Sequence, residues 1–312
     1  MLTNKYLKSF LNDSNDEVEI GFILNKVIKF EKIIEKSVLD WNQKDISNYL
    51  KSYKAISPSS LNKYASVVRR FVEYICEKEN CNIENFDTEK LNMENLIDIK
   101  GILNLTLNYS QYMNIKNQLS KMDGAEELNV RDKLMFELAW SSLTNEEIKM
   151  LKNDMIKFSK NDEGENIAIL FLNTRRIVRI EDFEIVEDIR KCMKEMYYVV
   201  TTKNNVYKRM SYRSSEYLVK PVNVGKGKKE DFLNNPGDTL HKIFKNNDIS
   251  CEGIDVDNLT MEDIRRSKIV YMLTPENREY FDDETILGLF NLKSKQSLVW
   301  YKNLANIKHG VI

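Results

Sequence analysis

The chain has 312 residues, of which 42% are hydrophobic and 30% charged, with only 10 glycines and 4 prolines. This length allows two ordinary domains, each with its own core, and the composition is typical of a helix-rich globular protein. It excludes collagen, long disordered tracts and a large all-β barrel. No apolar run approaches the roughly 18 residues of a membrane span, and no signal sequence opens the chain, so we expect a cytoplasmic protein without membrane contact.

Residue types that bind metals and nucleotides are scarce. The cysteines follow no zinc-ribbon or zinc-finger spacing; they are Cys76, Cys81, Cys192 and Cys251. Only two histidines are present, which argues against a histidine-based metal site. Neither a GxxxxGK[ST] loop nor a GxGxxG motif occurs. We therefore expect reduced thiols, no metal, and no nucleotide or other cofactor.

The net charge of −1 argues against a uniformly basic nucleic-acid coat, but the charge is unevenly distributed. Residues 203–229 contain eight basic side chains and one acidic side chain, a local excess of +7 (8 − 1). Tyrosines are interleaved with these cations, which favours phosphate contact over the usual interpretation, a solvated basic loop. The candidate DNA-binding residues here are Lys226, Lys228 and Lys229.

The first hundred residues show helical periodicity. The clearest helix is Asn62–Glu77, where Ser57 can cap the start and Pro58 fits the first turn. Segments 17–36 and 44–53 show the same spacing of apolar residues. The polar face of the clearest helix supplies further DNA-binding candidates, namely Lys63, Arg69 and Arg70. We assign residues 1–105 to a helical domain.

Polar residues dominate between positions 104 and 128, so we assign 106–128 to a linker and 129–312 to a second domain. Thr144 and Glu147 form a capping box for the helix Asn145–Lys152. The alternation in Ile167–Leu172 and Ile177–Ile180 predicts a β-hairpin within a small sheet. Further helices are expected to begin at Thr260, at Asp282 or Asp283, and at Ser294.

Three local motifs in this order resemble the tyrosine recombinase (phage integrase) family over residues 40–305. Ser142-Leu143-Thr144-Asn145-Glu146-Glu147-Ile148 resembles "TGLRxxEL", and Leu259-Thr260-Met261-Glu262-Asp263-Ile264-Arg265-Arg266-Ser267 resembles "LTxHxLRRT". Ile286-Leu287-Gly288-Leu289, followed by Tyr301, resembles "LLGH…Y". The resemblance implies a mainly α protein with a small β-sheet (α+β): an N-terminal helical core-binding (SAM-like) domain and a recombinase-like catalytic domain. It also implies double-stranded DNA as partner and self-association on that DNA.

The family's chemistry is attack of a tyrosine hydroxyl on a DNA phosphate, while arginine and His/Trp donors hold the phosphate oxygens and a hairpin lysine protonates the leaving group. The resemblance gives Tyr301 as nucleophile and Arg265 as the second arginine. The family's other catalytic positions are replaced, by Thr144, Phe171, Glu262 and Leu289 in chain order. Candidate substitutes for the missing cations are Arg175, Arg176 and Arg266.

These residues also have ordinary structural interpretations. In these interpretations, Thr144 serves purely as a helix cap, Arg265 forms a surface ion pair, and Tyr301 is a packing residue. A carboxylate at Glu262 repels the phosphate charge that such a site must collect, unless it is protonated or pairs with a neighbouring arginine.

Three functions remain open, all requiring duplex DNA binding. The protein is a nickase or relaxase-like strand cleaver with reduced chemistry, a catalytically inactive relative that acts as a replication initiator or regulator, or an active integrase with substituted residues. A helical scaffold that does not bind DNA is the alternative outside this class, and the near-zero net charge favours it. The abundance of Lys, Asn and Ile is typical of an AT-rich genome and fits a plasmid or mobile element.

Overall fold

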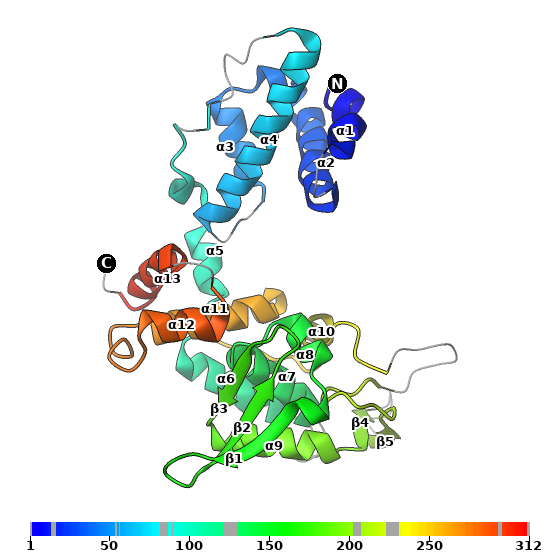
Figure 1. Ribbon diagram of the computed structural model, residues 1–312, viewed down its shortest axis with the longest axis vertical. Helices are drawn as coiled ribbons and strands as arrows, with labels where there is room; N and C mark the ends of the chain where they lie inside the picture. The colour runs from blue at the N-terminus through cyan, green and yellow to red at the C-terminus, as the bar shows by residue number, and fades with distance from the viewer. Residues whose placement is uncertain are drawn as a thin grey trace. The chain divides into compact units, whose positions relative to one another are not determined.

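The computed structural model describes residues 2–13, 17–53, 55, 57–81, 87–88, 90–120, 130–201, 207–222, 231–292 and 295–310. The chain divides into two compact units, residues 1–102 and 103–312, which are described separately (Figure 1). Within the described ranges, no helix combines the length and the apolar character that crossing a membrane requires.

The first unit is helical. Its elements are α1 (Leu2–Asn12), α2 (Glu17–Ile34), η1 (Val38–Asp40), α3 (Gln43–Lys51), α4 (Pro58–Glu79) and η2 (Met93–Leu96), and α5 (Ile99–Asn104) spans the boundary between the units. α4 begins as its sequence predicts, because the Ser57 side chain accepts from the backbone N–H of Ser60 and Pro58 occupies the first turn. Its apolar face, including Phe71 and Val72, is buried in the core of the unit.

The second unit combines helices with two small antiparallel sheets. Its first half contains α6 (Tyr109–Ser120), α7 (Val130–Trp140), α8 (Asn145–Met150), η4 (Asn153–Met155), β1 (Ile156–Lys160), β2 (Asn166–Phe171), β3 (Ile177–Ile180) and α9 (Phe183–Lys194). Its second half contains β4 (Tyr197–Thr201), β5 (Tyr207–Ser211), α10 (Pro236–Asn246), η5 (Val256–Asn258), α11 (Met261–Met272), α12 (Asp283–Phe290) and α13 (Lys295–Lys308). α7 lies in the middle and packs against α6, α9 and α11. The expected α+β fold class is confirmed.

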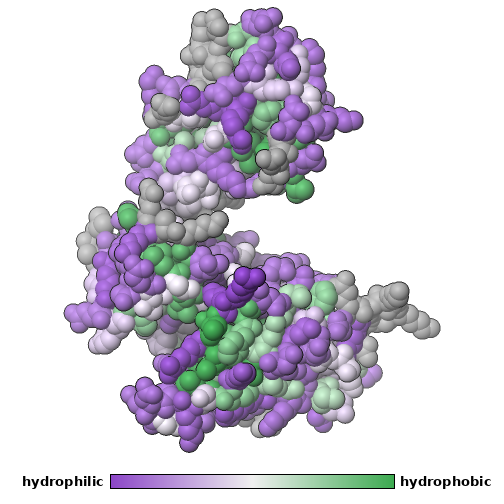
Figure 2. Space-filling model, viewed as in Figure 1, coloured by the Kyte–Doolittle hydropathy of each residue, from purple (hydrophilic) through white to green (hydrophobic). Residues whose placement is uncertain are grey.

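The predicted hairpin is the β2–β3 pair of a three-stranded sheet with the order β1-β2-β3. Because side chains alternate between the faces of a strand, Leu170 and Val178 enter the core while Phe171 and Ile177, paired in register, stay on the outer face. Figure 2 shows this outer face as an apolar patch surrounded by hydrophilic residues.

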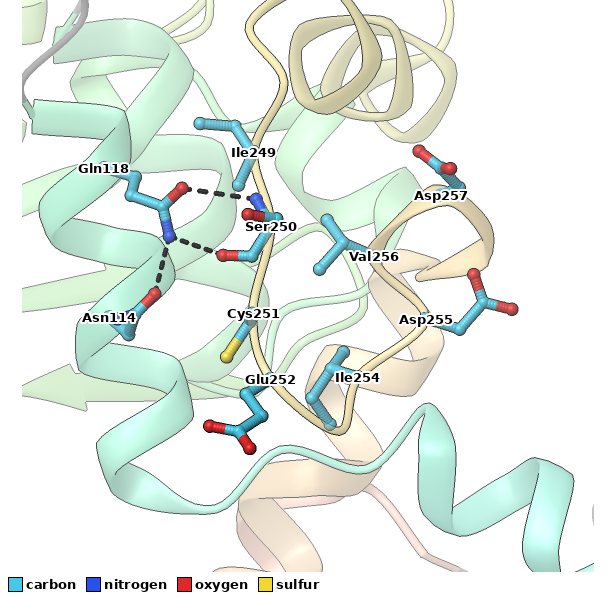
Figure 3. Close-up of a pocket in the computed structure, with 10 residues that line it drawn as sticks. All are labelled: Asn114, Gln118, Ile249, Ser250, Cys251, Glu252, Ile254, Asp255, Val256 and Asp257. Carbon is cyan, nitrogen blue, oxygen red and sulfur yellow. Dashed lines mark hydrogen bonds between the residues drawn. The ribbon is translucent and has the colours of Figure 1, made fainter.

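Residues 109–120, assigned to a linker because of their polarity, form α6 and belong to the core of the second unit. Tyr112, Ile115 and Leu119 are buried there. The two glutamines of α6, Gln111 and Gln118, donate to backbone carbonyls of the loop at 250–252. The Gln118 amide donates to the Ser250 carbonyl at 2.7 Å and accepts from the Ser250 N–H at 3.2 Å (Figure 3). Polarity here therefore marks helix–loop docking, not a domain boundary.

A buried charge cluster joins α6, α7 and α9. Glu137 is fully buried, with Lys116 Nζ at 3.2 Å and Lys133 Nζ at 3.8 Å from its carboxylate. Lys133 also pairs with Asp188, and Lys116 with Glu184. Burial raises the pKa of Glu137 to about 8; Lys133 and Lys116 oppose the shift and Asp188 reinforces it.

This raised pKa predicts a pH-dependent stability. An unfolded glutamate loses its proton near pH 4.3, while folded Glu137 keeps its proton to about pH 8, so stability falls as pH rises across that window and levels off above it. The Glu137→Gln variant keeps the shape of the side chain but removes the carboxyl group that titrates. We expect the unfolding midpoint of the variant to fall less than that of the parent between pH 6 and 8 in thermal melts. The exposed control Glu163→Gln should follow the parent, and parallel profiles for all three proteins would contradict the assignment.

Candidate functional site

The turn between α7 and α8 is strained. Ser142 has a φ of 85°, a region that favours glycine, and it is fully buried. The Leu143 N–H donates to the Leu138 carbonyl at 3.0 Å, which completes the helix C-terminal motif that calls for this left-handed residue. The carbonyl oxygen of Ser142 is then available to accept hydrogen bonds from side chains.

Arg265 of α11 is one donor to that oxygen. The Thr260–Asp263 capping box fixes the start of α11, and Arg265 lies buried just beyond the first turn. Its Nε donates to Ser142 O at 2.8 Å and its Nη2 to Phe290 O at 3.1 Å. Its Nη1 contacts both carboxylate oxygens of Glu262, at 3.1 and 2.9 Å. All three guanidinium nitrogens therefore have protein partners.

Arg176, immediately before β3, is the second donor. Its Nη2 lies 3.1 Å from Ser142 O, and its Nη1 donates to Ser142 Oγ at 3.2 Å and to the Leu289 carbonyl. Its Nε and Nη2 contact the two carboxylate oxygens of Glu147 at 3.1 and 2.5 Å. The structure therefore brings Arg176 and Arg265 together on one carbonyl oxygen, from segments about 90 residues apart in sequence.

Glu147 completes this cluster and was not among the sequence candidates. Burial opposes its ionisation, but hydrogen bonds from the Thr144 N–H, Arg176 and Thr174 outweigh it and hold the pKa of Glu147 below its ordinary value. Glu147 stands at the glutamate of the "TGLRxxEL" pattern, and its capping box with Thr144 was the signal that could have identified it. The same capping box occupies the Thr144 side chain, which accepts from Glu147 N at 3.2 Å.

Arg266 and Tyr301 lie beside the cluster. Arg266 is 2% exposed and donates to Asp263, while its Nε and Nη1 have no hydrogen-bond partner among the described residues. Tyr301 is half-buried on α13, which packs against α11. Burial raises the pKa of Tyr301; the charges of Arg266 and Arg265 lower it and that of Glu262 raises it. The Tyr301 phenol therefore lies within the electrostatic influence of Arg265, Arg266 and Glu262, and its raised pKa keeps it protonated.

Phe171, which stands where the family has its hairpin lysine, lies beside a lysine of the neighbouring strand β1. The Lys157 Nζ of β1 lies 5.1 Å from the centroid of the Phe171 ring, on the exposed face of the sheet. The sequence predicted no strand at 156–160, and Lys157 was therefore not among the candidate residues. Arg175 is not part of the cluster: it occupies the exposed hairpin turn with a φ of 62°, where its N–H donates to the Leu172 carbonyl.

The candidate DNA-binding residues of α4 are exposed, and two of them form ion pairs with glutamates. Lys63 pairs with Glu19 at 2.5 Å and Arg69 with Glu73 at 3.1 Å, while Arg70 lies on the same side of α4 as Lys63. Exposed pairs of this kind contribute at most about 1 kcal/mol, so a phosphate can replace the carboxylate at little cost.

The basic tract divides into three parts. Lys208 and Arg209 are exposed on β5. Lys220, in contrast, is buried, and its Nζ donates to the Cys192, Met193 and Glu195 carbonyls at the C-terminus of α9. That position suits a cation because helix carbonyls carry partial negative charge. Lys220 therefore has a structural role, and Lys226, Lys228 and Lys229 lie outside the described residues.

An open groove of about 640 Å³ lies between α6 and the loop before η5 (Figure 3). Glu252, Asp255 and Asp257 line it, so its charge repels phosphate, and it shares no residue with the arginine cluster. Within the described part of the chain, no three His, Cys, Asp or Glu side chains gather as metal ligands would.

The buried pair of Arg176 and Glu147 should dominate local stability. Arg176→Ala leaves Glu147 buried without its cation, which we expect to cost about 3 kcal/mol in the free energy of unfolding measured in urea. The adjacent variant Arg175→Ala removes an exposed cation from the same turn and should change stability by less than about 0.5 kcal/mol. Equal effects of the two variants would contradict the assigned pairing.

Comparisons with known proteins agree with this architecture. Residues 2–77 match the family model described as "MrpR, N-terminal core-binding domain". The Tn1549 transposon integrase in complex with transposon right end DNA is 11% identical, with a TM-score of 0.54 over 99% of each chain. XerH site-specific recombinase bound to difH substrate is 14% identical (TM-score 0.54; 99% of this chain, 82% of that one).

A lambda integrase dimer bound to a core site is 13% identical, with a TM-score of 0.52 over 96% of this chain and 75% of the other. No curated protein matches the chain by sequence. At these identities the structural likeness establishes the fold, which is the fold that the resemblance implied. The chain therefore has the tyrosine recombinase fold, and its residues 2–77 are similar to the MrpR N-terminal core-binding domain.

Proposed function

We propose that this protein binds a specific duplex DNA site without cleaving it, as a catalytically inactive recombinase relative that regulates or initiates a DNA process. One observation carries the proposal: the two clustered arginines are already paired, Arg176 with Glu147 and Arg265 with Glu262. A recombinase needs such donors free to hold the phosphate oxygens on which charge accumulates in the transition state.

DNA binding is supported by the fold and by exposed cations. The three structural neighbours were solved on DNA: transposon end DNA for the Tn1549 integrase, a difH substrate for XerH and a core site for lambda integrase. In this chain, exposed cations on α4 (Lys63, Arg69, Arg70) and on the outer face of the sheet (Lys157, Arg179) can contact phosphates. The tract with Lys226, Lys228 and Lys229 adds to this set by its sequence.

Several missing donors together disfavour cleavage. Losing one oxyanion donor costs about 2.7–4 kcal/mol of transition-state stabilisation, and such losses do not add simply because the donors act as a unit. Thr144, Glu262 and Leu289 stand where the family has donors, and Arg176, the nearest substitute, is held by Glu147. The raised pKa of Tyr301 also disfavours the phenolate that would attack phosphorus.

A second function, a slow nickase using Tyr301, has one observation in its favour. The Nε and Nη1 of Arg266 are buried donors without a described partner, and their charge acts on Tyr301. A phosphate that reached them would be near the tyrosine.

We also propose self-association on DNA, as in the lambda integrase dimer, and an origin on a plasmid or mobile element, in the cytoplasm.

One experiment separates the alternatives. A bound duplex is first selected from a random-sequence library, and then nicked duplexes of that site, which trap covalent adducts, are incubated with the protein. We expect salt-sensitive retention on a native gel and no adduct on a denaturing gel. An adduct that Tyr301→Phe abolishes and the exposed control Tyr280→Phe retains would establish the nickase instead. Absence of salt-dependent retention would refute DNA binding altogether.

Glu262 should weaken DNA binding by repulsion. Its side chain is 54% exposed, so it can leave Arg265 for solvent, but its charge remains close to an incoming phosphate. We expect Glu262→Gln to tighten binding roughly fivefold to tenfold, about 1 to 1.4 kcal/mol, in fluorescence anisotropy at low salt. The exposed control Glu279→Gln makes the same charge change outside the cluster and should have little effect; equal gains would mean that only net charge matters.

A further inference from the structure

The C-terminus of α4 brings two cysteines together. α4 ends at Glu79, and Asn80 adopts the left-handed conformation with a φ of 51°. The N–H groups of Asn80 and Cys81 both donate to the Cys76 carbonyl, the latter at 3.0 Å. In this helix-terminating motif, the side chains of the fourth-last helical residue and of the residue after the left-handed one frequently contact each other. Here these two residues are Cys76 and Cys81.

We propose that Cys76 and Cys81 form a reversible disulfide site, reduced at rest and bridged by a peroxide oxidant. Both are free thiols, Cys76 buried and Cys81 partly exposed. A disulfide needs two backbones held close, with their Cβ atoms directed toward each other. The hydrogen bond between Cys81 N and Cys76 O holds the two backbones close in the reduced protein, so we expect bridging to require side-chain rotation and no refolding.

The thiols also interact with each other. Burial first, and then the hydrogen bond and charge of Cys81, raise the pKa of Cys76 to about 11. Cys76 is therefore a poor first nucleophile, and the more exposed Cys81 is the thiol that meets an oxidant from solvent.

The reaction balances with hydrogen peroxide as the oxidant. The Cys81 thiolate attacks one peroxide oxygen, the O–O bond breaks, and the protein gains a sulfenic acid while the other oxygen leaves as water after taking up a proton. The Cys76 sulfur then attacks the Cys81 sulfur and loses its proton, so the S–S bond forms and a second water leaves. Two equivalents of a small thiol reverse the step and become a disulfide themselves.

The other two cysteines serve as internal references. Cys192 is 1% exposed, and its thiol donates to the Leu218 carbonyl at 3.3 Å. Cys251 is partly exposed in the loop beside the acidic groove. Neither belongs to a helix terminus that carries a second cysteine, so we expect Cys76 to pair with Cys81 and no other pair of cysteines to form a bridge.

The bridge would also fix a tertiary contact. Glu79, two residues before Cys81, accepts from Lys5 Nζ at 2.7 Å and from the Tyr6 hydroxyl, both on α1. Locking the end of α4 should therefore slow local opening of α1 as well as of the helix terminus.

The test uses the full chain, treated with hydrogen peroxide, alkylated under denaturing conditions and mapped by peptide mass. We expect a Cys76–Cys81 bridge, seen as loss of two hydrogens and of both alkylation sites, which dithiothreitol reverses. Cys251→Ser should still form the bridge and Cys81→Ser should not, with circular dichroism showing both variants folded. Hydrogen exchange should slow in α1 and at the end of α4 on oxidation of the parent only.

Three results would overturn the proposal. Overoxidation of Cys81 while Cys76 remains alkylatable would show that the thiols cannot meet. Disulfide-linked dimers that persist in Cys251→Ser would show that Cys81 pairs between molecules. Unchanged alkylation of Cys76 after peroxide would show that the site is inert. None of these readouts involves DNA, so the outcome is independent of the proposed function.

Discussion

The carbonyl oxygen of Ser142 is the acceptor on which the arrangement of the second unit depends. It takes hydrogen bonds from Arg176 at 3.1 Å and from Arg265 at 2.8 Å, and the same guanidinium groups reach the Leu289 and Phe290 carbonyls. One strained turn thereby fixes the β2–β3 hairpin, α11 and the end of α12 relative to α7. Because a buried guanidinium is costly unless it is paired, each of these contacts constrains the others.

The charges around this acceptor are internally balanced. The two clustered arginines and the neighbouring Arg266 pair with three carboxylates (Glu147, Glu262, Asp263), so these six side chains have a formal charge of zero (3 − 3). Glu262 is 54% exposed, against 4% for Glu147 and 7% for Asp263. An approaching phosphate can therefore displace one carboxylate of the three, which allows a ground-state contact but does not free the several donors that a transition state requires.

The sequence predicted features whose causes are local. Ser57, Thr144 and Thr260 each cap a helix by bonding a residue three positions later, so four residues contain the whole signal. The polarity of α6 did not reveal its packing from sequence, because the partner of Gln118, Ser250, lies 132 positions away. Arg175 and Arg176 could not be separated, since which of two adjacent arginines faces the cluster depends on strand register and on the left-handed conformation of Arg175.

A catalytic motif can persist for reasons unrelated to catalysis. Arg265 holds the Ser142 turn and the end of α12, and Tyr301 packs on a helix that contacts α11, so both residues are retained by the fold whether or not a phosphate ever reaches them. The positions that the resemblance gives as catalytic donors are occupied here by Thr144, Phe171, Glu262 and Leu289, and two of these residues already have partners in the fold, Thr144 in Glu147 and Glu262 in Arg265.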